Sequence, residues 1–89
     1  MANPTAGDPF TALEAQALLG KTFESLVSLG GVPKGTRGKL IDLEGSSNLG
    51  FEVVIEWELK PATRYLRRWL TKNELGQFTR EVEPTTLQR

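Results

Sequence analysis

This 89-residue chain has no His and no Cys, so the side chains that could carry out chemistry are its carboxylates, its cations and its Ser hydroxyls. Imidazole bases, thiolate nucleophiles and the usual zinc ligands are therefore excluded. Glu52, Glu56 and Glu58 have the spacing that places side chains on one face of a strand. A solvated strand face leaves carboxylates with ordinary acidity and loose geometry. We therefore expect no catalytic residue, no metal site and no cofactor, and the chain is predicted not to be an enzyme.

A glycine-rich segment, GGVPKGT, occupies residues 30–36. Gly30 and Gly35 have the spacing of a phosphate-binding loop, but Thr and Arg follow where that motif requires Lys and then Ser or Thr. A strand is expected to follow, so the segment would lack the helix N-terminus that binds phosphate. It is predicted to be a turn between strands, and its Lys34 and Arg37 are secondary candidates for contact with a partner.

Charge is segregated along the chain, although eleven Lys and Arg residues balance eleven Asp and Glu residues. Residues 42–58 contain five acids and no base, whereas residues 60–72 contain five bases and no acid. If residues 51–59 and 64–70 form a hairpin, opposite charges face each other across it. Each such pair stabilises a sheet by about 0.2–1 kcal/mol and helps to fix the register.

Aromatic rings and arginines are interleaved in the basic segment, at Tyr65, Arg67, Arg68 and Trp69. Residues of these types dominate the binding energy of protein interfaces. We therefore expect these four residues to contact a protein partner, so that the chain is a binding or accessory module of a larger complex. Rings beside guanidinium groups also suit single-stranded RNA, so binding of RNA or another nucleic acid is the alternative. The zero net charge and the adjacent acidic segment argue against it.

Short strands must position these residues. In residues 51–59 the side chains of Phe51, Val53, Ile55, Trp57 and Leu59 alternate with more polar ones. This period of two predicts a strand with a dry face and a wet face. Further strands are predicted over 21–29, 37–44 and 79–83. In residues 64–70 neither parity is cleanly apolar, because arginines interrupt both. The segment therefore predicts the partner strand, with a helix beginning at Pro61 as the alternative.

Two capping boxes predict short helices. Thr11 with Glu14, and Thr71 with Glu74, have the spacing at which each side chain bonds the other residue's backbone N–H. The first box begins a short helix ending near Gly20, and the second begins a helical turn before the last strand.

The predicted fold is mainly β: a small five-stranded barrel, closed or half-closed, with a short N-terminal helix. A barrel leaves fewer unpaired strand edges than a flat sheet of this size. The expected organisation is a flexible N-terminal arm over 1–10, the helix over 11–20, the barrel over 21–83 and a C-terminal tail over 84–89. No apolar run approaches the ~20 residues of a membrane span, and a chain without Cys is expected in the reducing cytoplasm.

The order of these features resembles the SH3-like small barrels, including bacterial domains related to the KOW type. The resemblance is carried by GTRGKLI at 35–41, FEVVIEW at 51–57 and LTKNEL at 70–75, and it spans residues 21–83. It implies a fold whose members bind peptides, RNA, ribosomes or enzyme complexes, so the fold alone does not select a function. The Ala-Leu-Tyr-Asp-Tyr-like run of domains that bind proline-rich peptides is absent from the first strand, so polyproline recognition is not expected.

Overall fold

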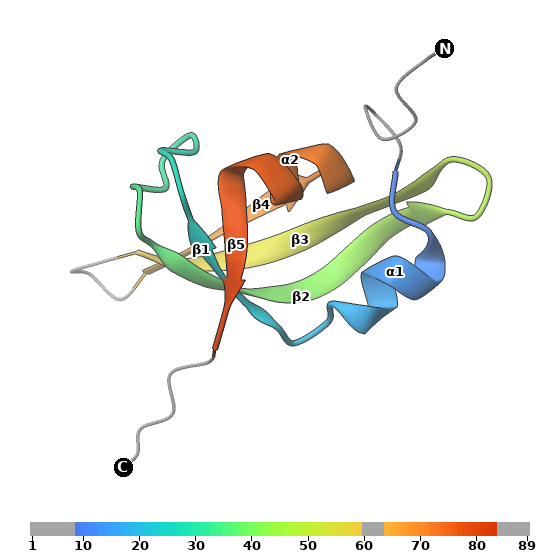
Figure 1. Ribbon diagram of the computed structural model, residues 1–89, viewed down its shortest axis with the longest axis horizontal. Coiled ribbons are helices and arrows are strands. Elements are labelled where there is room, and N and C mark those ends of the chain that lie inside the picture. The colour runs from blue at the N-terminus through green and yellow to red at the C-terminus, as the bar shows by residue number, and fades with distance from the viewer. Residues whose placement is uncertain (1–8, 60–63, 84–89) are drawn as a thin grey trace.

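The structure is a computed structural model that describes residues 9–59 and 64–83. Its strands are β1 (Thr22–Ser25), β2 (Arg37–Ser46), β3 (Gly50–Leu59), β4 (Arg64–Leu70) and β5 (Thr79–Val82), and its helices are α1 (Ala12–Ala17) and α2 (Lys72–Phe78) (Figure 1). The predicted mainly β fold, with five strands and two short helices, is confirmed. The predicted turn over 60–63, the tail over 84–89 and all but the last two residues of the predicted arm lie outside the described residues.

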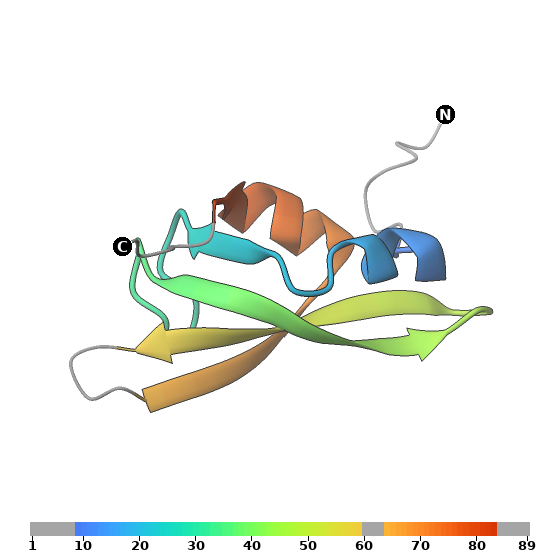
Figure 2. The same cartoon turned by 90° about the horizontal axis from the view of Figure 1, so that it is seen from below.

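The strands form one antiparallel sheet in the order β4-β3-β2-β1-β5. The chain therefore runs along the sheet from β1 to β4, and α2 then carries it back so that β5 pairs with β1. In the described residues β4 and β5 are the two edges and do not pair with each other, so the sheet is not closed. Of the two forms expected from the sequence, closed or half-closed, the closed barrel is wrong. Both helices lie on the same side of the β2–β3–β4 layer, which we call the inner face (Figure 2).

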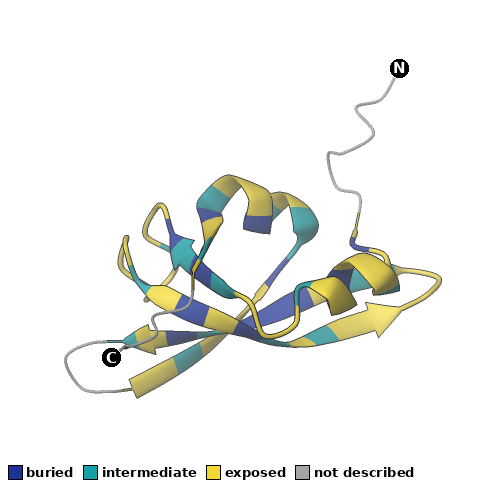
Figure 3. Cartoon of the chain, turned by 60° about the horizontal axis from the view of Figure 1, so that its bottom comes forward, coloured by how far each residue is buried: buried dark blue, intermediate teal, exposed yellow. Residues whose placement is uncertain are grey.

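The core lies on the inner face and is centred on β3. Val53, Ile55 and Trp57 are each 0% exposed, as the alternation predicts. Figure 3 shows buried positions along the strands of the sheet. Gly38 on β2 pairs with Trp57, and a Cβ at residue 38 would lie 2.7 Å from both Cε3 of Trp57 and Cγ2 of Ile55. Glycine at this position lets the indole ring pack directly on the β2 backbone.

The outer face of β3 is less wet than the sequence predicts. Val54 is 3% exposed, although it alternates with glutamates. Its neighbours across the sheet are Asp42 on β2 and Trp69 on β4. A register shift in β2 between Leu40 and Asp42 leaves an extra residue opposite Val54, which explains why the apolar residues of β2 do not share one parity.

The N-terminal residues that are described belong to the sheet. The sequence predicts an arm up to residue 10, but Phe10 is buried and forms an isolated bridge with Phe51. The Phe10 N–H donates to the Phe51 carbonyl oxygen at 3.2 Å, and the Phe51 N–H donates to the Phe10 carbonyl oxygen at 2.9 Å. Pairing between β3 and β4 ends at Val53 and Leu70, so Phe10 covers the β3 edge beyond β4.

Both predicted capping boxes are confirmed. In α1 the Glu14 N–H donates to Oγ1 of Thr11 at 3.1 Å, and the Thr11 N–H donates to Oε1 of Glu14 at 3.0 Å. In α2 the equivalent distances between Glu74 and Thr71 are 3.1 and 2.9 Å. α1 packs on the sheet through Ala15, and α2 through Leu75.

Candidate docking surface

Residues 64–70 form the strand β4 and not the alternative helix. β4 pairs with β3 along its whole length, from Leu59 opposite Arg64 to Val53 opposite Leu70. The predicted pairing of opposite charges occurs at Glu56 and Arg67, which are direct cross-strand partners. Their ion pair joins Nε of Arg67 to Oε2 of Glu56 at 3.2 Å.

The alternation of β4 divides the four residues predicted as the main contact patch between two faces. Tyr65, Arg67 and Trp69 lie on the outer face, because they pair with Glu58, Glu56 and Val54. Arg68 pairs with Ile55 and therefore lies on the inner face. Tyr65 and Trp69 are 61% and 49% exposed, so two large rings flank Arg67 on an open sheet face.

The two secondary candidates occupy different places. Arg37, at the start of β2, is exposed and borders the same outer-face groove as Tyr65. This groove is lined by Thr22, Arg37, Gly38, Lys39, Glu56, Glu58 and Tyr65. Lys34 is exposed in the loop before β2 and does not line the groove. The structure thus brings Arg37, but not Lys34, to the same groove as Tyr65.

The predicted glycine-rich turn packs against the inner face of β4. Gly30 and Gly31 have φ values of +22° and +91°. They form a tight turn between Leu29 and Val32, whose backbone groups exchange hydrogen bonds of 2.8 and 2.6 Å. The Arg68 guanidinium occupies the space that a Cβ at residue 30 would need. The turn therefore requires glycine for positive φ, whereas the exposed Arg68 side chain could move to make room for a Cβ.

A second groove, which we call the edge groove, lies at the C-terminal end of β4. It is lined by Leu29, Gly30, Arg68, Trp69, Leu70, Glu74 and Phe78. It reaches both Arg68 and Trp69, whose side chains point to opposite faces of the sheet. Sequence reasoning missed this groove, since its walls come from the glycine turn and α2, far from β4 along the chain.

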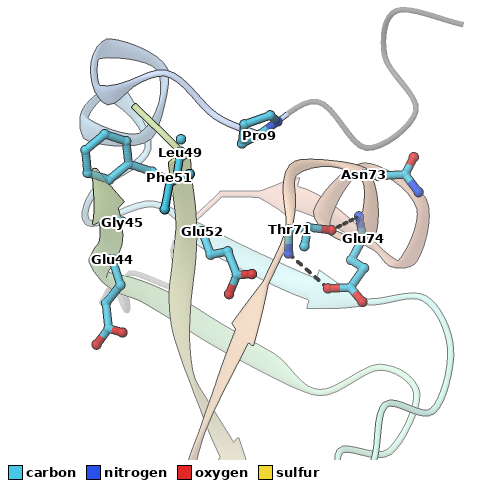
Figure 4. Close-up of a pocket in the computed structure, with 10 residues that line it drawn as sticks. Pro9, Glu44, Gly45, Leu49, Phe51, Glu52, Thr71, Asn73 and Glu74 are labelled. Atoms are coloured by element: carbon cyan, nitrogen blue, oxygen red, sulfur yellow. Dashed lines mark hydrogen bonds between the residues drawn. The ribbon is translucent and has the colours of Figure 1, made fainter. Parts of the chain in front are cut away.

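Another hollow lies between the β2–β3 hairpin and α2 and has an acidic lining (Figure 4). Glu44 and Glu52 are direct cross-strand partners there, and Glu74 lies on α2. The Glu74 carboxylate already accepts the Thr71 N–H at 2.9 Å, so it serves the helix cap. Across residues 9–59 and 64–83, no group of three or more acidic side chains is placed to hold a metal ion.

A perturbed carboxylate lies away from β4, at the contact between the two helices. The pKa of Glu14 is lowered, first by the hydrogen bond from the Thr11 N–H and then by Lys72. Nζ of Lys72 lies 3.1 Å from Oε2 of Glu14. The lowered pKa reflects a helix cap and an ion pair between helices, which are structural roles.

No protein-family model, curated protein or solved structure matches the chain. Neither helix in the described part of the chain is long and apolar enough to cross a membrane.

Proposed function

We propose that this protein is a non-catalytic protein-binding module, an accessory part of a larger complex. Its contact surface is the outer face of β4, formed by Tyr65, Arg67 and Trp69, with Arg37 at the border. The observation that carries the proposal is the exposure of two large rings, 61% for Tyr65 and 49% for Trp69, on either side of an arginine. Aromatic and arginine residues are the types that contribute most to protein interfaces.

The charges around the rings favour a protein over a nucleic acid. Glu56 and Glu58 stand on β3 beside Arg67 and Tyr65, and Glu56 pairs with Arg67 at 3.2 Å. These carboxylates reduce the positive potential that phosphate groups would need. Aromatic rings and arginine are instead the residue types enriched in protein interfaces, and the glutamates beside them suit the polar rim of such an interface.

We also propose that the fold is of the SH3-like class and that the protein acts in the cytoplasm. The class is supported by the return of β5 to the side of β1 and by the short helix between β4 and β5. The location rests on the cysteine-free sequence, which suits a reducing compartment. The non-catalytic role rests on the same sequence, which lacks His and Cys.

The test is quantitative capture of partners from an extract of the native host with Trp69→Ala and Arg67→Glu variants. Arg80→Glu is the matched control, since Arg80 on β5 pairs with Glu24 across the sheet at 2.9 Å and its side chain is 63% exposed against 62% for Arg67. Capture of a specific partner should fall with both β4 variants, by about 30-fold for the loss of a hot-spot ring in Trp69→Ala. Capture by the control should be unchanged.

Retention of every partner by both β4 variants would contradict the proposal. A single-stranded oligonucleotide provides the competing measurement. Binding of that oligonucleotide that weakens steeply with salt and is lost in Arg67→Glu would favour nucleic acid over protein.

A further inference from the structure

We propose that β4 accepts an extended acidic peptide as an additional strand of the sheet. This inference rests on the proposed function, and it specifies how the partner binds and what chemistry it has. The partner would pair through its backbone with the free edge of β4 and place carboxylates beside the β4 arginines.

The first argument is the unpaired backbone of β4. In the described residues β4 is an edge strand whose partner in the sheet is β3. Alternate N–H and C=O groups over Arg64–Leu70 therefore point away from the sheet and can form a ladder with another extended chain. The neighbouring edge of β3 is already covered by Phe10 at Phe51, so the open ladder lies at β4 itself.

The second argument is that a strand at this edge would meet side chains from both faces of β4. Its side chains would alternate between Tyr65, Arg67 and Trp69 on the outer face and Arg64, Leu66 and Arg68 on the inner face. The edge groove touches Arg68 and Trp69 together. A partner bound to one face of the sheet would contact only one of these two sets of side chains, whereas an added strand contacts both.

The third argument is charge, which selects an acidic peptide over a second copy of this chain. Arg67 is paired with Glu56, whereas Arg64 and Arg68 have no ion pair within the described residues. Two β4 edges paired with each other would bring arginines together, and like charges across a ladder are destabilising. A strand that carries glutamates would instead oppose these arginines with carboxylates.

The experiment uses the full chain and a peptide of about eight residues with uncharged ends, in which Glu alternates with Val. This alternation favours extended structure. The first control peptide has the same sequence with N-methyl groups on pairs of consecutive residues, which removes ladder donors from both edges of the peptide but keeps every charge. The second replaces Glu by Lys. Binding is followed by NMR chemical shifts and by amide hydrogen exchange.

We expect saturable binding of the acidic peptide, shift changes centred on β4 and slower exchange of its outward amides. The N-methylated peptide should bind at least about tenfold more weakly, because several ladder bonds are lost. Arg64→Gln should weaken binding by about two- to fivefold. The matched Arg80→Gln on the opposite edge removes the same charge and should leave binding unchanged.

Equal binding of the two acidic peptides would overturn strand addition and leave the docking surface of the proposed function intact. Equal binding of the Lys peptide would overturn the acidic specificity. No saturable binding, or a dimer of this chain with protected β4 amides, would overturn the whole inference. Failure of the proposed function would be seen separately, as capture of the same partners by the Trp69→Ala and Arg67→Glu variants.

Discussion

At the scale of single residues, glycines have sharply different roles that depend on what surrounds them. Gly38→Ala would place a Cβ 2.7 Å from Cε3 of Trp57 and Cγ2 of Ile55, both in the tightly packed core. Overpacking of this kind destabilises by about 1–3 kcal/mol. We expect a corresponding fall in the free energy of unfolding, measured by urea denaturation with an unchanged m-value.

Gly76 provides the control for Gly38. It lies inside α2, and a Cβ there would meet nothing within 4 Å. Gly76→Ala should therefore stabilise the protein by up to about 1 kcal/mol, because alanine is the better helix former. If both variants changed stability equally, the close packing of Trp57 on residue 38 would not be the cause.

At the scale of elements, Glu14 joins α1 to α2, and this connection should depend on pH. Its pKa is lowered from 4.5 by the Thr11 N–H and then by Lys72. A carboxylate with a lowered folded-state pKa stabilises the fold above its ordinary pKa, and the contribution is lost as pH falls through the folded value. Glu14→Gln keeps an oxygen for the cap and removes the charge. We expect it to be less stable than the parent at neutral pH, with a difference that disappears in acid.

The measurement is thermal unfolding of both proteins over a series of pH values. Lys72→Met is the companion variant, because it removes the cation while Thr11 and Glu14 keep their capping box. The difference in stability between Lys72→Met and Glu14→Gln should still depend on pH, but less than the difference between the parent and Glu14→Gln. The dependence persists because the backbone hydrogen bond is the larger cause of the lowered pKa of Glu14. A stability gap between parent and Glu14→Gln that stayed constant down to strong acid would contradict this role for the charge.

The elements that could be predicted from the sequence are those determined by local patterns. The strand β3 and the two capping boxes are predicted from neighbouring residues alone, and all three are confirmed. β1 ends at Ser25, earlier than predicted, although Leu26 and Val27 would suit a strand. The Ser25 hydroxyl donates to the Pro33 carbonyl at 2.8 Å and accepts from the Thr36 N–H at 3.1 Å. This contact with a distant loop has no local signal in the sequence.

The candidate surface was predictable by residue type but not by arrangement. Tyr65, Arg67 and Trp69 share a face only because residues 64–70 form a strand, and the apolar residues of that segment allow both a strand and a helix. Pairing with β3 decides between them. The same pairing places Arg68 on the inner face, where it meets the Gly30 turn. Contacts between segments far apart along the chain therefore determine which candidate residues can bind together.

At the scale of the whole molecule, stability should be concentrated in the middle of the sheet and fall towards its edges. β3 pairs with both β2 and β4 and contains three side chains that are 0% exposed. β4 and β5 each have one free edge, and β5 is a short strand of 4 residues, Thr79–Val82. Amides that exchange solely by global unfolding report the full stability, about 5–15 kcal/mol for small proteins. We expect this slowest class at Val53–Trp57 and at the paired residues of β2.

Native-state hydrogen exchange at increasing denaturant concentration would test this gradient. Outward amides of β4 should exchange through small local openings that hardly depend on denaturant, because they need no loss of the core. The β3 amides should depend on denaturant as steeply as global unfolding does. A slowest class in α2 or β5 would contradict the gradient and would mean that the core is organised around the C-terminal elements. The free β4 edge would then border a part of the sheet that is not the most stable part of the fold.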